Sequence, residues 1–405
     1  MTAVIEKVLR SGTCAGCGAC ESICGASTIH VKIDEAGFFR PKVLAPISDQ
    51  DNLLFSKVCP GVTVAHLPGD GDCDPVWGPV LAIKTGYAKD AAIRYQGSSG
   101  GVLTALQVHL LESNLVDAVV NIGAAADQPL RNDVYISRNS DEIIGRAGSR
   151  YAPSSPLREI HSLLDGVQRV AFVGKPCDVS AMRRLATFDP RLKGKEFYYL
   201  SFLCAGVPSQ NATTSLVKAL GVNPEEVVKF RYRGEGWPGY AKAETRDGRT
   251  AKMSYNDSWG KILNRHLQTR CKICPDGTGE FADISCGDAW HGDEKGFPDF
   301  KELDGRSAIL VRTSRGEALI RSALDTGHIE VEERQFSLDD LSRMQPYQVN
   351  RRKMLIPRTV AFFLFKRGHV RFTFKAAVSA LRLITPIQVC REFLGTTKRL
   401  LRGKL

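Results

Sequence analysis

The chain has 405 residues, which is enough for two or three domains with a sizeable hydrophobic core. Its 43% hydrophobic and 24% charged residues are ordinary for a soluble globular protein. The twelve cysteines are spread over this length instead of being concentrated in a short secreted chain, so metal binding or catalysis is favoured over a disulfide framework. The N-terminal residues lack an apolar signal core, and we therefore expect a cytoplasmic protein.

The net charge of +11 is concentrated at one end of the chain. Residues 351–405 contain fourteen Lys and Arg and a single acid, Glu392, so this stretch carries +13 and the remainder carries −2. A basic excess confined to the tail, residues 346–405, indicates a separate contact surface and gives no reason to expect nucleic acid on the main body.

Three cysteines at strict two-residue spacing, Cys14, Cys17 and Cys20, lie in a Gly- and Ala-rich loop. With Cys24 they match the bacterial ferredoxin pattern C-x2-C-x2-C-x3-C, whose fourth cysteine serves the other cluster of a two-cluster module. A two-cluster module contains a second run of this pattern, and Cys59, which a proline follows, stands where that run would end. The other three cysteine positions of the second run are occupied by Asp49, Asn52 and Phe55. We therefore predict one [4Fe–4S] cluster on Cys14, Cys17, Cys20 and Cys59. A zinc knuckle on one C-x2-C pair is the alternative.

Residues 1–65 are predicted to form this small ferredoxin-like module, with two short strands at 28–33 and 37–43 around a turn. Residues 66–76 have the Gly, Asp and Pro content of a linker. The main domain, residues 77–345, follows the linker. We therefore predict two folded parts joined by a connecting segment.

The main domain alternates apolar strands at 116–122, 169–173 and 197–203 with helical stretches at 156–165, 179–186 and 213–220. This alternation predicts an α/β fold with a mixed, partly parallel sheet. Cys177 follows one strand and Cys204 ends another. Because ligand-binding loops of such sheets lie beyond the strand ends, the two cysteines are expected to be neighbours.

A Gly- and Ser-rich loop, residues 96–101, leads directly into a strong helical stretch at 102–112. Free backbone amides and the positive end of the helix dipole suit a phosphate group at this position. The alternative is a simple helix cap and turn.

Beyond Gly221 the pattern is β-rich, with a strand region at 231–240 and a hairpin turn at 247–248. A helix predicted over 259–269 leads to Cys271 and Cys274, and residues 307–313 are expected to form a last core strand. The alternative for this C-x2-C pair is a zinc site. The alternative for Cys177 and Cys204 is that they are buried core residues without a metal.

In these motifs the chain resembles the coenzyme F420 hydrogenase/dehydrogenase β-subunit family, which includes 7-hydroxymethyl chlorophyll a reductase. The resemblance runs from about residue 80 to residue 320. The matching segments are QGSSGG (96–101), AGSRYA (147–152), GKPC (174–177), FLC (202–204), C-x2-C (271–274) and ADIS (282–285).

The resemblance implies an iron–sulfur flavoprotein. A second [4Fe–4S] cluster would be ligated by Cys177, Cys204, Cys271 and Cys274. FAD would be held by the loop, by residues of the second motif and by a lysine: Gln96, Ser98, Ser99, Gly100, Gly101, Ser149, Arg150, Tyr151 and Lys175. The family also admits F420 as a cofactor, although no residue here is diagnostic of it. His291 and Asp288 are candidate proton donors; a structural histidine is the alternative for His291.

We interpret the chain as an FAD- and [4Fe–4S]-dependent oxidoreductase. A ferredoxin or another redox protein would supply electrons to the first cluster, which would pass them to the second cluster and to FAD for a small-molecule acceptor or donor. The alternatives are an electron-transfer subunit of a larger complex without its own substrate, and a zinc-bearing protein with its tail on nucleic acid.

The tail interleaves aromatic and aliphatic residues with basic ones over residues 360–384. Its apolar runs are too short to span a bilayer. Such a segment suits a membrane surface or an acidic partner protein, and we expect peripheral contact with the inner face of a membrane. The alternative is helices packed back on the main domain with their basic residues in solvent.

Overall fold

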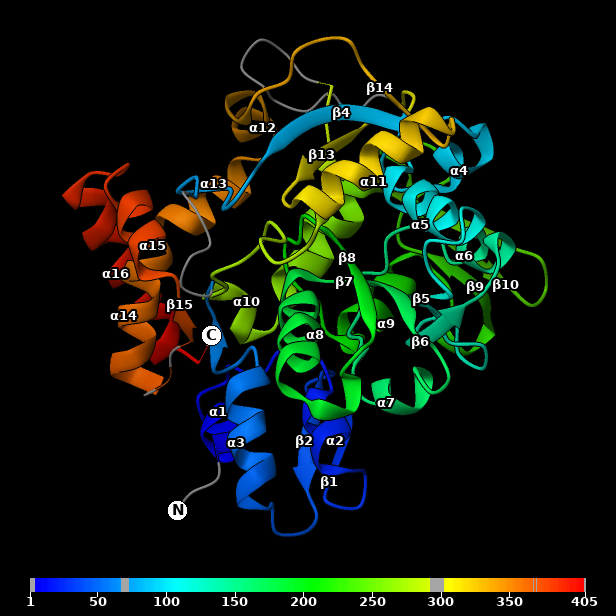
Figure 1. Cartoon of the computed structure of the whole chain (residues 1–405). Coiled ribbons are helices and arrows are strands. Elements are labelled where there is room, and N and C mark those ends of the chain that lie inside the picture. The colour runs from blue at the N-terminus through cyan, green and yellow to red at the C-terminus, as the bar shows by residue number, and fades with distance from the viewer. Residues whose placement is uncertain (1–3, 67–72, 292–301, 367, 369, 404–405) are drawn as a thin grey trace.

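The computed structural model describes residues 4–66, 73–291, 302–366, 368 and 370–403. Its centre is an eight-stranded sheet with the order β14-β4-β13-β12-β8-β7-β5-β6 (Figure 1). Strands β12, β8, β7 and β5 are mutually parallel, and the outer pairings are antiparallel. The mixed, partly parallel sheet that the sequence predicts is confirmed. The strands are β4 (Ala82–Ala88), β5 (Ala118–Ala124), β6 (Asn132–Ser137), β7 (Arg169–Gly174), β8 (Glu196–Phe202), β12 (Ile284–Asp288), β13 (Ser307–Val311) and β14 (Ile329–Val331).

The two faces of this sheet have separate hydrophobic cores, because alternate residues of a strand point to opposite faces. In β7, Val170 and Phe172 pack with helix α8, whereas Ala171 and Val173 pack with helices α5 and α11. Helices that lie between these strands in the chain include α4 (Ala91–Gln96), α5 (Val102–Glu112), α6 (Ser140–Gly145), α7 (Ile160–Leu163), α8 (Pro176–Phe188) and α11 (Ser314–Asp325), and α12 (Leu338–Met344) follows the last strand.

One predicted helix, residues 156–165, is shortened to the single turn α7. The backbone amide of Leu157 donates 2.9 Å to the carbonyl oxygen of Cys17, so this segment is held against the N-terminal module before the helix begins. A contact between distant parts of the chain therefore overrides the local helix propensity.

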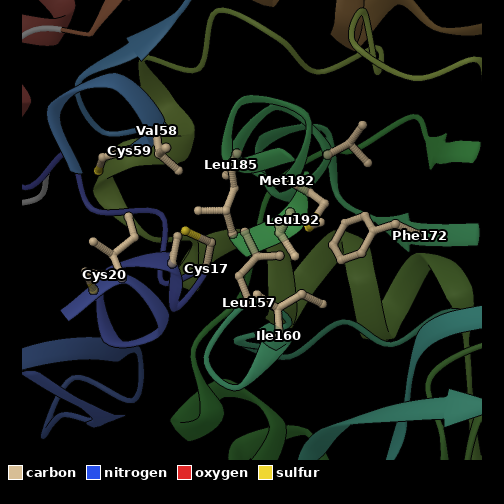
Figure 2. Packing of buried hydrophobic residues seen from close by; sticks show 14 of the residues in the cluster. Cys17, Cys20, Val58, Cys59, Leu157, Ile160, Phe172, Met182, Leu185 and Leu192 are labelled. Carbon is tan, nitrogen blue, oxygen red and sulfur yellow. The ribbon is translucent and has the colours of Figure 1, made fainter. Parts of the chain in front are cut away.

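The N-terminal module contains α1 (Val4–Arg10), α2 (Ala19–Cys24), β1 (Ile29–Ile33), β2 (Phe39–Val43) and α3 (Asp49–Val58). Strands β1 and β2 form the expected antiparallel hairpin, with Ile29 opposite Val43. The module shares one continuous core with the main domain: Figure 2 shows Cys17 and Val58 of the module beside Leu157 and Leu185 of the main domain. The two parts are therefore packed together instead of being joined only by a linker.

A second sheet, β11-β10-β9, packs against α9 (Gln210–Ala219). Its strands are β9 (Val227–Arg231), β10 (Tyr240–Thr245) and β11 (Thr250–Ser254), and the hairpin at Asp247 and Gly248 is as predicted. The helix expected over 259–269 is instead a π-helix η3 (Asn256–Ile262), a 3-10 turn η4 (Leu263–His266) and the short α10 (Thr269–Lys272). Gly260 weakens a regular helix here, and Trp259 packs on Tyr151 at 4.8 Å between ring centroids.

The C-terminal helices are α13 (Pro346–Lys353), α14 (Leu355–Lys366), α15 (Phe374–Leu381) and α16 (Pro386–Leu401). They lie together at one edge of the molecule, beside α10 and the N-terminal module (Figure 1). A short strand in the tail, β15 (Arg371–Phe372), pairs with β3 (Thr63–Val64) at the end of the module. In the part of the chain described here, no helix has the length and apolar character needed to cross a bilayer.

Candidate functional site

The first four predicted cysteine ligands converge in the N-terminal module. Cys14 and Cys17 lie in the loop between α1 and α2, Cys20 is in the first turn of α2, and Cys59 caps α3. All four are buried and enclose a cavity of 20 Å³ together with small residues of the loop.

The closeness of these thiols affects their protonation. Burial raises the pKa of Cys59 to about 12, and negative charge on Cys14 contributes to the rise. Burial likewise raises the pKa of Cys17 and Cys20 well above the ordinary thiol value. Metal binding at this site must therefore displace protons.

Cys24 belongs to a different environment. It ends α2, is half-buried, and is not among the residues that enclose the cavity. Its pKa is raised to about 11 by burial and then by Asp51, with Arg191 opposing the rise. The thiols of the first set do not contribute to this shift, in keeping with the prediction that Cys24 is left outside the set.

The second set of cysteines comes from three separated segments. Cys177 lies in the first turn of α8, Cys204 directly follows β8, and Cys271 and Cys274 lie in and just after α10. Burial, then charge on neighbouring members of the set, raises the pKa of Cys204 to about 12. Asp178, Cys274 and Cys204 add to the effect of burial in raising the pKa of Cys177. The structure thus brings the four residues together.

Among the described residues, no three His, Cys, Asp or Glu side chains are gathered tightly enough to hold one metal ion. A single zinc ion at ~2.3 Å from each sulfur would bring tetrahedral thiolates to within about 3.8 Å of one another. A four-iron cubane attaches each thiolate to a different iron atom, so its ligands lie farther apart.

A buried arginine, Arg270, lies between the two cysteine sets. Its Nη2 donates 3.2 Å to the carbonyl oxygen of Pro60, beside Cys59, and its own chain neighbour is Cys271. Burial lowers the pKa of Arg270, but negative charge on the second cysteine set, Cys274 first, outweighs burial and raises it. Its Nε and Nη1 have no hydrogen-bond acceptor within the described structure.

A second buried arginine borders the same cysteines. Arg351, in α13, donates 2.8 Å from Nη1 to the carbonyl oxygen of Cys204, and its Nε has no acceptor among the described groups. Neither Arg270 nor Arg351 forms an ion pair with a carboxylate of the described chain. Buried cations without a counter-charge are costly, so the second cysteine set has the electrostatics of a site for an anionic group.

A cavity of 640 Å³ lies beyond the carboxyl ends of the parallel strands and reaches the second cysteine set. This volume is in the range of cofactor sites. Cys204 lines it directly. Seven of the nine predicted flavin residues also line it: Ser98, Ser99, Gly101, Ser149, Arg150, Tyr151 and Lys175.

The two other predicted flavin residues, Gln96 and Gly100, do not line the cavity. The carbonyl oxygen of Gln96 accepts 2.7 Å from Nη2 of Arg231. The amide of Gly100 donates 3.0 Å to Oγ of Ser307, and a Cβ at Gly100 would lie only 2.7 Å from a carbonyl oxygen of β4. Both residues therefore shape the loop without lining the cavity.

Helix α5 points its N-terminus at the cavity. Gly101, its N-cap, has φ of +74° and supplies no capping side chain, and the first-turn residues Val102, Leu103 and Thr104 line the cavity. The amides of a first helical turn have no partner inside the helix. The loop thus offers the arrangement of amides and dipole that suits a phosphate.

Several predicted polar residues are already engaged by the protein. Arg150 donates to Oδ1 of Asn132 and to carbonyl oxygens of its surroundings, which fixes the adjoining loop. Lys175 donates 2.8 Å to Ser154 and forms a buried ion pair of 2.5 Å with Asp178. These side chains shape the cavity wall. The hydroxyl of Ser98 accepts a hydrogen bond of 2.6 Å from the amide of Ser149, which joins the 96–101 loop to the 147–152 segment.

The two candidate proton donors lie in different places. Asp288 lines the cavity, and its carboxylate accepts from both guanidinium Nη atoms of Arg233 at 2.7 and 2.8 Å and from Trp237 at 3.0 Å. His291 packs edge-on against Trp237 and is not part of the cavity lining; burial lowers its pKa.

Sequence reasoning missed three residues of the site: Arg270, Arg351 and Lys272. Lys272 lines the cavity next to Cys271, and burial lowers its pKa. Basic residues on both sides of Cys271 were a visible signal in the sequence. Arg351 gave no such signal, because it was counted with the tail and not with the domain that it completes.

Profiles of known families match most of the main domain. Residues 83–161 match the N-terminal part, and residues 167–335 the C-terminal part, of the coenzyme F420 hydrogenase/dehydrogenase beta subunit. The chain belongs to this family. The resemblance noted from the motifs is therefore confirmed, and it includes both the α5 loop and the second cysteine set.

The individual relatives of this family member are distant. A coenzyme F420-dependent sulfite reductase of Methanocaldococcus jannaschii is 24% identical over 87% of the chain, which spans only 52% of that relative. A coenzyme F420 hydrogenase subunit beta of Methanococcus voltae is 26% identical over 63% of the chain and 83% of its own length. The chloroplastic 7-hydroxymethyl chlorophyll a reductase of Oryza sativa is 27% identical over 54% of the chain and 45% of its own length.

A solved structure has the same fold. One chain of the F420-reducing [NiFe] hydrogenase complex from Methanosarcina barkeri superposes with a TM-score of 0.56 at 21% identity, over 74% of this chain and 99% of the other. At this identity the similarity concerns the fold alone.

Proposed function

We propose that this protein is an iron–sulfur flavoprotein oxidoreductase with two [4Fe–4S] clusters and FAD. The observation that carries the proposal is the position of Cys204, which belongs to the second cysteine set and also lines the 640 Å³ cavity. A cofactor in that cavity would lie next to whatever the four cysteines hold. Bound clusters exchange single electrons, and a bound flavin links single-electron exchange to hydride transfer.

The residues present fit these groups. Each set offers four cysteines, and the buried guanidinium groups of Arg270 and Arg351 supply positive charge where an anionic thiolate-ligated cluster would need it. The first turn of α5 offers backbone amides to a phosphate, and Tyr151 and Trp259 give aromatic surface to the same cavity.

The chain's own residues then have distinct roles. Cys14, Cys17, Cys20 and Cys59 would hold one cluster, and Cys177, Cys204, Cys271 and Cys274 the other. Arg270 would fix the two sites relative to each other, because it donates a hydrogen bond to the backbone beside Cys59 and precedes Cys271 in the chain. The ion pair of Arg233 and Asp288 fixes the far wall of the cavity.

The direct test is anaerobic purification of the full chain with an absorbance spectrum, iron and sulfide assays and flavin extraction. We expect about eight irons and one FAD per chain, four irons for each set of cysteines. A colourless preparation that contains zinc in place of iron would contradict the proposal.

A matched pair of substitutions tests the phosphate site. Leu103 lies in the first turn of α5 and lines the cavity. Leu103→Asp should not disturb the helix, because a carboxylate is favourable near a helix N-terminus. Its negative charge would repel the phosphate beside the amides, so FAD content should fall about tenfold or more while iron is retained. Leu103→Asn removes the same apolar side chain without the charge and should keep most of its FAD. Equal FAD content in the two variants would place the phosphate elsewhere.

A second candidate function is supported by the names of the relatives. Several are subunits of F420 hydrogenases or dehydrogenases, which act in larger assemblies. The protein would then pass electrons to or from a redox partner, such as a ferredoxin, and would have no small-molecule substrate of its own. Oxidation of reduced F420 by the purified full chain would support a small-molecule substrate, whereas electron exchange with ferredoxin in the absence of any oxidation of F420 would support the electron-transfer subunit.

A further inference from the structure

The C-terminal helices are firmly attached to the main domain. Phe362 of α14 and Leu400 of α16 pack with Ile273, which lies between two cysteines of the second set. The single acid of the stretch, Glu392, forms ion pairs with Arg358 at 2.7 Å and Arg399 at 3.2 Å. The packing predicted as the alternative for the tail is therefore present, and only its outward surface is available to a partner.

This outward surface is unusually apolar. Of the eighteen large hydrophobic side chains that are exposed in the described structure, nine lie on or between α14, α15 and α16. They are Val360, Phe363, Leu364, Phe365, Phe374, Leu383, Ile387, Leu394 and Leu401. Exposed apolar groups concentrated in three helices that pack on one another mark a candidate interaction site.

The exposed residues of α16 follow a regular pattern. Ile387, Leu394 and Leu401 are 79%, 63% and 71% exposed and are spaced by seven residues, so they form one line along the helix. Arg391 and Lys398 each follow a member of this line by four residues and are exposed beside it. We call these five residues the α16 stripe.

We propose that the α16 stripe, with the exposed residues of α14 and α15, binds the surface of a bilayer that contains anionic lipids. The apolar line would enter between the headgroups, and Arg391 and Lys398 would lie at the level of the lipid phosphates. Exposed basic side chains of the same region, among them Arg371, Lys375 and Arg382, complement such a surface, whereas Arg351 and Arg352 are buried and do not contribute. The inference is independent of the proposed redox function.

The same charges disfavour a second copy of the chain as the occupant. A symmetric pairing through the α16 stripe would place Arg391 and Lys398 against their own counterparts. The one nearby acid, Glu392, is already paired within the tail. Like charges in close contact are destabilising, whereas an anionic surface meets both residues favourably.

The test is co-sedimentation of the full-length protein with vesicles of phosphatidylcholine mixed with phosphatidylglycerol, and with vesicles of phosphatidylcholine alone. We expect binding to the mixed vesicles that weakens as salt is raised. Leu394→Glu should reduce partitioning about tenfold or more. Arg391→Gln should reduce it about fivefold.

The control is Leu53→Glu, which makes the same change at a leucine of α3 that is 57% exposed. It should bind as the unmodified protein does, and all variants should keep their iron and flavin content. No binding to mixed vesicles, equal binding to both kinds, or equal loss in Leu53→Glu would overturn the proposal. So would a dimer that Leu394→Glu dissociates in the absence of vesicle binding.

Discussion

Arg270→Met is expected to stabilise the iron-free protein and, at the same time, to weaken its retention of iron. In the iron-free chain Arg270 is buried without a carboxylate partner among the described residues, and only the cysteines of the second set, Cys274 first, offset the cost of burying its charge. Methionine fills a similar volume without a buried charge, which should raise the free energy of unfolding by about 1–3 kcal/mol. With a cluster bound, the same change removes a nearby cation, and iron at the second site should be lost.

The measurements are urea unfolding of the iron-free protein and iron per chain after anaerobic reconstitution. Arg270→Lys is the matched control, because it keeps the charge and should keep most of the iron. If Arg270→Met were less stable without iron and equally rich in iron when reconstituted, Arg270 would have only a structural role, through its bond to Pro60.

Local patterns predict the elements of this fold well where the chain's own neighbours decide them. The β1–β2 hairpin is confirmed because its alternation and turn are contained in fifteen residues. Helix α5 begins directly after the Gly-rich loop, as expected. The helix predicted over 156–165 is shorter than expected, since Leu157 is held by Cys17. The helix predicted over 259–269 is divided into a π-helix, a 3-10 turn and the start of α10, with Trp259 packed on Tyr151. Such contacts join residues far apart in sequence, and no local pattern encodes them.

The residues of the cavity show the same difference between what local patterns predict and what contacts in space decide. Ser98, Ser149 and Lys175 were identified through motifs, and all three line the cavity. Whether a polar side chain remains available to a ligand depends on its partners in space: Lys175 is engaged by Asp178, and Asp288 by Arg233. The shared core between module and main domain was missed for a similar reason, because a stretch with linker composition says nothing of the surfaces that it brings together.

Substitution of single cysteines should divide the iron content in a characteristic way. Cys59→Ser removes a ligand of the first set and should leave about half of the iron, since the second set keeps its four cysteines. Cys274→Ser should lose the other half and also change the flavin spectrum, because its set reaches the cavity through Cys204. Iron and flavin per chain, with the electron paramagnetic resonance of the reduced protein, distinguish these results.

Cys24→Ser is the matched control for Cys59→Ser, since it makes the same change in the same module. Cys24 lies outside the cavity that Cys14, Cys17, Cys20 and Cys59 enclose, and its electrostatic neighbours are Asp51 and Arg191. Its loss should therefore leave the iron content nearly unchanged. A large loss of iron in Cys24→Ser together with none in Cys59→Ser would show that the N-terminal loop completes its own cluster and that Cys59 is a core residue.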